Sequence, residues 1–171
     1  MIIQGDAFRL RQAEKSDIQA IFQWENDVVN WFVSDTVAPY TLADIEEFIL
    51  DRNDIFMSGQ MRMIIEDESI NPIGCIDFFD FNPKNRRVGI GILIDEKHRG
   101  KGFGKKAVKL ATIFALESLD VKGVYAEVAE SNIGSQRIFE GCGYEKSGIK
   151  LSWLWDGDAY QNQIFYQRID K

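Results

Sequence analysis

The segment Arg99-Gly-Lys-Gly-Phe-Gly104 has the residue types and the spacing of a phosphate-binding loop. Glycine accepts positive φ, so such a loop can turn and present its backbone N–H groups without obstruction by side chains. A strand-like run over 88–94 precedes it and a helix-like run over 105–118 follows it, which would add the positive end of a helix dipole. Residues 97–109 hold six Lys or Arg and no Asp or Glu, although the net charge of the chain is −7. We therefore expect an anionic ligand at this loop.

Two common phosphate-binding motifs do not fit this loop. A Walker loop needs Ser or Thr after its Gly-Lys pair, and Lys106 occupies that place. The dinucleotide fingerprint needs its third glycine one residue later than Gly104. The pattern that fits is Arg-x-x-Gly-x-Gly at Arg99, Gly102 and Gly104. It resembles the acyl-CoA pyrophosphate loop of the GNAT superfamily of N-acetyltransferases. The alternative is a glycine-rich turn before a basic, solvated helix start.

A second motif, over residues 127–144, agrees with this resemblance. It contains Glu127-Val-Ala-Glu-Ser-Asn132, a short helical run with Phe139 near its end, and the pair Gly143-Tyr144. A strand, an asparagine, a short helix with an aromatic end and a Gly-aromatic pair are similar to the late segment of GNAT enzymes. The resemblance implies that Asn132 hydrogen-bonds the pantetheine arm. An asparagine at this position is also a suitable helix N-cap, and the two roles can coexist.

The resemblance spans essentially the whole chain. It is closest to the branch that includes ribosomal-protein N-terminal acetyltransferases and spermidine acetyltransferases. Trp24-Glu-Asn26 in the early helix and the hairpin turn at Asp156-Gly157 are consistent with that branch. It implies acetyl-CoA as the cosubstrate, with the backbone of residues 92–94 free to pair with the pantetheine amides. The residues that it implies for acetyl-CoA binding are Ile92, Leu93, Ile94, Arg99, Gly100, Lys101, Gly102, Phe103, Gly104, Lys105, Asn132, Ser135, Arg137 and Phe139.

The elements that must position these residues are strands and helices in an α+β order. Alternating apolar residues predict strands over 8–12, 61–65, 73–81, 86–94, 124–129, 151–155 and 163–169. Helices are predicted from residue 18, from residue 42, over 105–118 and over 133–140. We predict a GNAT-type mixed, mostly antiparallel central sheet flanked by helices. The strands on either side of the helix over 105–118 are expected to be parallel. The resemblance implies that this pair splays apart at the acyl-CoA site.

The catalytic groups are harder to assign. Many GNAT enzymes protonate the leaving thiolate with a tyrosine at the position of Phe139, and phenylalanine has no proton to donate. Another group or water must then supply that proton, and Tyr144 is the first candidate, with Tyr125 and Tyr160 as alternatives. In this reading Phe139 packs against the CoA arm instead.

Glu127 is the best candidate for the general base. Its position corresponds to the glutamate with which some GNAT members relay the proton of the amine. A carboxylate in mid-strand is costly unless it faces water or has a partner, which points to a role in the site. The alternative is an ordinary exposed glutamate. Asp77 and Asp80 are weaker candidates.

The first 56 residues are strongly acidic and are expected to bind the acceptor. They hold 11 Asp or Glu against 4 Lys or Arg. In GNAT folds the first helices and their connection wall the acceptor cleft, where acid would attract a cation. The predicted substrate-binding residues are Glu25, Trp31, Phe32 and Asp35. We expect transfer of acetyl to a small cationic amine, such as a polyamine or diamine. A protein or peptide N-terminus, an amino sugar or another amine, and a non-catalytic acetyl-CoA-binding module remain alternatives.

Length and composition restrict the class of protein, its partners and its compartment. A chain of 171 residues that is 45% hydrophobic and 27% charged fits one acyl-CoA N-acyltransferase domain over 1–171. Its acidity disfavours nucleic acid as a partner. It carries no run long enough to span a membrane and no evident signal peptide. Two cysteines and a single histidine, His98, suggest a cytoplasmic protein without a disulfide framework or a metal site. The oligomeric state is left open, with a homodimer as one alternative.

Overall fold

The computed structural model describes residues 1–28, 30 and 38–170. Its strands are β1 (Ile2–Gln4), β2 (Phe8–Gln12), β3 (Met61–Asp67), β4 (Pro72–Asn82), β5 (Arg87–Ile94), β6 (Gly123–Ala129), β7 (Glu145–Trp155) and β8 (Tyr160–Ile169). Its α-helices are α1 (Ile18–Glu25), α3 (Leu42–Glu47), α4 (Ile55–Ser58), α5 (Phe103–Ser118) and α6 (Ile133–Gly141). Short 3₁₀ turns, η1 (Lys15–Asp17) and η3 (Glu96–His98), and a π-helical segment, η2 (Phe48–Arg52), complete the described elements.

The strands form one sheet in the order β1-β2-β3-β4-β5-β6-β8-β7. Every neighbouring pair is antiparallel except β5 and β6, which α5 connects in parallel. The mixed, mostly antiparallel α+β fold predicted from the sequence is therefore confirmed.

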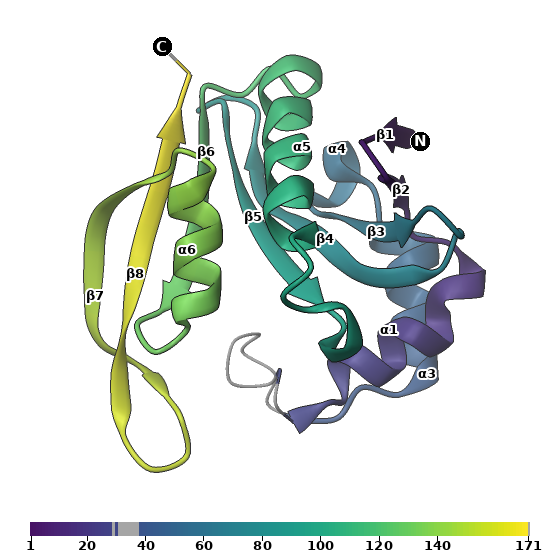
Figure 1. Ribbon diagram of the computed structural model, residues 1–171, viewed down its shortest axis with the longest axis horizontal. Helices are drawn as coiled ribbons and strands as arrows, with labels where there is room; N and C mark the ends of the chain where they lie inside the picture. Colours follow the sequence, from purple (N-terminus) through teal and green to yellow (C-terminus); the bar gives the residue numbers. More distant parts are fainter. Residues whose placement is uncertain (29, 31–37, 171) are drawn as a thin grey trace.

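The sheet divides where β5 leaves β6. Their pairing runs only from Arg87 opposite Gly123 to Gly89 opposite Tyr125. Beyond Gly89, β5 continues its pairing with β4 as far as Ile94, while β6 continues its pairing with β8 as far as Ala129. Figure 1 shows the two strands diverging, with α5 beside β5 and α6 beside β6. The predicted splayed pair is confirmed.

Two hydrophobic clusters cover the two faces of the sheet. The larger one packs α5 and α6 against residues such as Ile76, Ile90 and Val124. The smaller one packs α1 and α3 against Ile64 and Cys75. Because successive strand residues point to opposite faces, Cys75 and Ile76 belong to different clusters. The helices α5 and α1 therefore approach the splay from opposite faces of the sheet.

The hairpin of β7 and β8 closes the chain as predicted, with longer strands than expected. In its turn the Asp156 carboxylate accepts the N–H groups of Asp158 and Ala159, and Gly157 has a φ of +103°. The first half of β7 was missed because most of its side chains are exposed, which removes the apolar alternation that marks a strand.

Candidate active site

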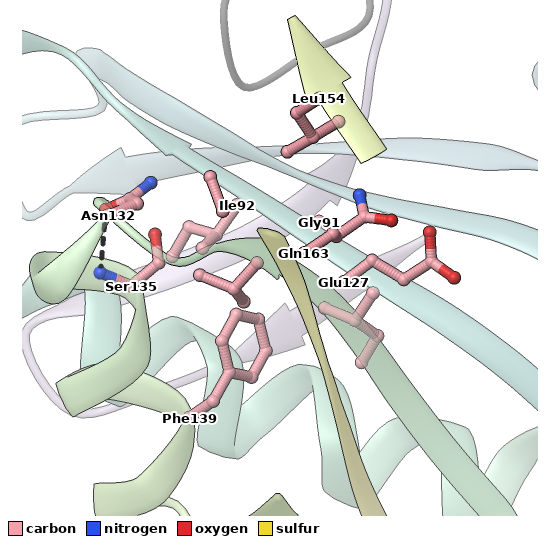
Figure 2. Close-up of a pocket in the computed structure, with 11 residues that line it drawn as sticks. Gly91, Ile92, Glu127, Asn132, Ser135, Phe139, Leu154 and Gln163 are labelled. Carbon is pink, nitrogen blue, oxygen red and sulfur yellow. Dashed lines mark hydrogen bonds between the residues drawn. The ribbon is translucent and has the colours of Figure 1, made fainter. Parts of the chain in front are cut away.

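A cavity of about 1000 Å³ opens where β5 and β6 separate. Its walls come from β4 and β5, the glycine loop, the starts of α5 and α6, the end of β6, and Glu25 at the end of α1. A smaller cavity of about 100 Å³ lies beside it. Figure 2 shows this smaller cavity, in which residues of α6 meet residues of β5, β6 and β8. The residues that line both cavities are Ile90, Gly91, Ile92, Glu127, Asn132, Ser135 and Gln163.

The glycine loop presents bare backbone to the large cavity. Gly100 and Gly102 have φ values of +75° and +83°, and a Cβ on either would meet nothing within 4 Å. Gly102 is also the N-cap of α5 and supplies no side-chain cap, so the first N–H groups of a 16-residue helix face outward unpaired. Positive φ combined with open space is the pattern expected of a backbone cradle for phosphate.

Gly104 has a different role from the one the sequence suggested. It lies inside the first turn of α5, where a Cβ would stand 2.8 Å from Cδ1 of Ile138 in α6. The third glycine therefore permits close packing of α5 against α6 and does not help to turn the loop. The helix begins at Phe103, two residues before the predicted start.

Arg99 ties the loop to the end of β5 and to the segment after α1. Its Nε donates to the Ile94 carbonyl at 2.9 Å, and its Nη2 donates to Asn30 Oδ1 at 3.2 Å. The buried Asn30 in turn donates to the Trp24 carbonyl at 3.0 Å. Asn30 was not predicted, because nothing in its local sequence marks it as a partner of a loop 69 residues away.

Most of the residues predicted for acetyl-CoA binding line the cavities. Those in the wall of the large cavity are Ile92, Leu93, Ile94, Arg99, Gly100, Gly102, Phe103, Gly104, Lys105, Asn132 and Ser135. Phe139 lines the smaller cavity. Lys101 and Arg137 are exposed and line neither.

Asn132 and Ser135 mark the start of α6 at the edge of both cavities. Asn132 Oδ1 accepts the Ser135 N–H at 3.1 Å, the bond drawn in Figure 2, so Asn132 is the N-cap of α6 as expected. Capping uses only the oxygen of the amide, whose two N–H donors remain for other partners. The geometry is therefore compatible with the pantetheine contact that the resemblance implies.

Phe139 and Tyr144 pack together, and only Phe139 reaches a cavity. Their rings lie edge to face at 5.1 Å. Tyr144 is 3% exposed, its hydroxyl is 2.7 Å from Thr112 Oγ1, and burial raises its pKa. The structure thus does not bring Tyr144 to the cavities. Tyr125, bonded to Asp80, and the exposed Tyr160 also line neither of them.

Glu127 lines both cavities and has a cationic partner. The Lys150 ammonium on β7 lies 2.6 Å from Glu127 Oε1, with the two side chains 36% and 27% exposed. Lys150 also stands 5.2 Å from the centre of the Trp153 ring. The carboxylate is therefore partly exposed to solvent and also paired with a cation. Either condition is enough for a glutamate to be tolerated in mid-strand.

A largely buried arginine links two carboxylates in the wall of the large cavity. Arg62 of β3 holds Asp77 of β4 through Nε at 2.6 Å and Nη2 at 2.8 Å, and its Nη1 lies 2.5 Å from Glu25 Oε1. Burial works to lower the pKa of the Arg62 guanidinium, but the adjacent negative charges outweigh it and raise that pKa. Arg62 was missed because its role depends on α1 and β4 meeting around it.

The predicted acceptor residues divide between described and undescribed parts of the chain. Glu25 lines the large cavity, together with Tyr40. Trp31, Phe32 and Asp35 lie outside the described residues. Among the described residues, no helix is long and apolar enough to cross a membrane, and no group of three His, Cys, Asp or Glu could hold a metal ion.

The comparisons with known proteins agree with this geometry. A family model, the acetyltransferase (GNAT) domain, matches residues 8–145. The spermidine N(1)-acetyltransferase of Vibrio cholerae is 26% identical over 156 residues, which cover 90% of this chain and 87% of that protein.

Solved structures share the fold. The V. cholerae spermidine N-acetyltransferase in complex with CoA and spermine superposes with a TM-score of 0.83 at 24% identity, covering 95% of each chain. A dodecameric structure of the V. cholerae enzyme gives a TM-score of 0.82 at 24% identity, covering 95% of this chain and 94% of that one. Because the family model covers most of the chain and the bare glycine cradle suits a pyrophosphate, the protein belongs to the GNAT family and is an acetyl-CoA-dependent N-acetyltransferase.

Proposed function

We propose that the acceptor is a small cationic primary amine of the polyamine class. The observation that carries this proposal is the charge of the acceptor wall. Three carboxylates, those of Glu25, Asp77 and Glu127, line the large cavity, and Arg62 lies between the first two. A partly buried negative wall favours a cation over a neutral amine. The spermidine acetyltransferase activity of the Vibrio cholerae relative supports the same substrate class.

The chain's own residues divide the work of the reaction. In this proposal the Gly100–Gly102 cradle and the start of α5 hold the pyrophosphate, the free edge of β5 over 92–94 aligns the pantetheine arm, and Asn132 donates to it. Bound acetyl-CoA supplies an activated thioester at the junction of the two cavities. Phe139 shapes the smaller cavity around the reacting end.

Glu127 is the proposed general base. Its carboxylate takes a proton from the ammonium group of the acceptor, directly or through one water, and the electron pair stays on nitrogen. The Lys150 ammonium holds the carboxylate through an ion pair at 2.6 Å. Phe139 carries no exchangeable proton and Tyr144 is sealed against Thr112, so we assign protonation of the leaving thiolate to water in the open cavity.

The test is release of free thiol from acetyl-CoA with a panel of amines. The panel contains spermine, spermidine, putrescine, a short peptide with a free N-terminus, and glucosamine. We expect the highest kcat/KM with a polyamine. Faster turnover of the peptide would replace this proposal with N-terminal acetylation, and faster turnover of glucosamine would replace it with amino-sugar acetylation.

We further propose that the protein works in the cytoplasm as a homo-oligomer, of which a homodimer is the smallest form. The free thiols of Cys75 and Cys142 are consistent with a reducing compartment. The dodecameric Vibrio cholerae structure supports assembly. Light scattering on a size-exclusion column tests it, and a monomeric mass at micromolar concentration would contradict it.

A further inference from the structure

Gln163 of β8 carries an unsatisfied polar atom in the wall of both cavities. The side chain is 8% exposed. Its Oε1 is buried without a hydrogen-bond partner, and it is the one buried side-chain oxygen or nitrogen in that state within the described part of the chain. An unpaired buried acceptor destabilises the fold, so its presence in a cavity wall indicates that a ligand supplies the missing donor.

The position of Gln163 places that acceptor beside the proposed base. β8 lies between β6 and β7, and Gln163 pairs with Ala129 on one side and with Lys150 on the other. Paired residues share a face, and residues two apart on a strand share it as well, so Gln163 and Glu127 stand on the same face. Figure 2 shows the carboxamide and the carboxylate next to each other at the smaller cavity.

The chemistry of the missing donor identifies the ligand group. An amide oxygen accepts only from N–H or O–H. The reacting end of an acetyl thioester has a carbonyl and a sulfur, which offer no donor. A protonated primary amine has three N–H donors. Of the two groups that react at this junction, the nitrogen of the acceptor is therefore the one that can satisfy Gln163.

We infer that Gln163 Oε1 accepts one N–H of the reacting amine while Glu127 removes a second proton. This inference rests on the proposed function. One N–H bond breaks, its proton moves to a Glu127 oxygen, and its electron pair becomes the lone pair that attacks the thioester carbonyl. The C–N bond forms as the C–S bond breaks, and a further proton lost by the nitrogen reaches the leaving CoA thiolate through water. The N–H held by Gln163 fixes the direction of that lone pair. Gln163 is thus a catalytic residue that requires an ammonium nitrogen with at least two N–H groups, a condition that primary and secondary amines meet and tertiary amines do not.

The test replaces the acceptor with an apolar side chain of similar length. Gln163→Met should lower kcat/KM for the best amine by about 10- to 100-fold, the range for a hydrogen bond to a charged group. The Kd of acetyl-CoA by calorimetry should stay within about twofold, because this contact is with the amine. The melting temperature should stay the same or rise, since an unpaired buried acceptor is removed. Gln167 lies on the same strand but lines neither cavity. The control variant Gln167→Met should therefore change none of these values.

Three results would overturn the inference. Unchanged kcat/KM in Gln163→Met would show that the amine does not need the acceptor. A weaker Kd for acetyl-CoA would assign Gln163 to the pantetheine arm. A lower melting temperature in Gln163→Met, with the same decrease in Gln163→Leu, would show that Gln163 serves to stabilise the fold. If the wild-type protein acetylates no amine, the proposed function fails and this inference with it. Wild-type turnover that survives in Gln163→Met removes the inference alone.

Discussion

The large cavity has two halves that are built from different kinds of group: the donor half, which we propose to bind acetyl-CoA, and the acceptor half, which we propose to bind the amine. The donor half, formed by residues within 92–105 and 131–138, contributes backbone groups: the free edge of β5, two glycines with positive φ, and the first turns of α5 and α6. The acceptor half presents charged and polar side chains from α1, β3, β4, β6 and β8. They are Glu25, Arg62, Asp77, Glu127 and Gln163.

This difference explains what a sequence can reveal. A backbone site is made by a few consecutive residues, so its glycines and its flanking strand and helix form a motif. A side-chain site is made by residues up to 138 positions apart, such as Glu25 and Gln163, and exists only after folding. Substitutions should therefore affect the two halves in different ways, with stability at risk in the acceptor half and ligand affinity at risk in the donor half.

Arg62→Met should have the largest effect of the four changes considered. It leaves the largely buried Glu25 and the partly buried Asp77 without their shared cation. Breaking such a network costs about 3 kcal/mol of unfolding free energy, which urea denaturation would measure. Arg86→Met, which breaks the exposed pair with Asp120, is the control and should cost less than about 1 kcal/mol. Equal losses in the two variants would contradict a special role for the acceptor wall.

Gly102→Val should act on the donor half by weakening acetyl-CoA binding. The residue would need a φ of +83°, and a branched side chain would cover the N–H groups at the start of α5. We expect the Kd measured by calorimetry to rise about 100-fold, equivalent to about 2.7 kcal/mol.

Gly157→Val is the matched control for this change. Gly157 also has positive φ, and a Cβ there meets nothing within 4 Å, but it lies in the hairpin turn outside both cavities. It should carry a similar backbone penalty and retain the wild-type Kd. Wild-type affinity in Gly102→Val would remove the cradle from the binding site.

The fold could be predicted further than the site. Apolar alternation located all strands except β1, and the helix between 86–94 and 124–129 indicated their parallel pairing. The exposed half of β7 was not located, because the local sequence pattern carries no signal for a strand that leaves most of its side chains in solvent. The start of α5 was placed two residues too late.

Within the site, the residues that were missed have partners distant in sequence. Arg62 reaches Glu25 and Asp77, Lys150 reaches Glu127, and Asn30 reaches Arg99. Tyr144 shows the opposite case, in which a chemically suitable residue near the motif turns into the core. Chain position indicated proximity to the site, but packing against Thr112 determined where the hydroxyl points.

Glu127→Gln tests whether the acceptor half also carries the proton transfer. The amide cannot accept the proton, so kcat should fall by about 10²-fold, the usual order for loss of a general base. The Kd of acetyl-CoA should stay unchanged, and the limb of the pH–rate profile that reports the base should disappear. Glu145→Gln, an exposed change on β7, is the control. An unaltered pH profile in Glu127→Gln would remove this residue from the role of base.

Phe139→Tyr should have the smallest effect and would refine the boundary between the two halves. The ring is 2% exposed and lines the smaller cavity, so a hydroxyl there could donate a proton to the leaving thiolate. If protonation by water limits turnover, kcat should rise by up to about 10-fold, which is less than the roughly 10²-fold that an optimally positioned acid contributes. Phe114→Tyr, which places a hydroxyl on α5 outside both cavities, should not change kcat. No change of kcat in Phe139→Tyr would show that protonation of the thiolate does not limit turnover. Water in the acceptor half would then already supply the proton fast enough, and Phe139 would serve only to shape the cavity.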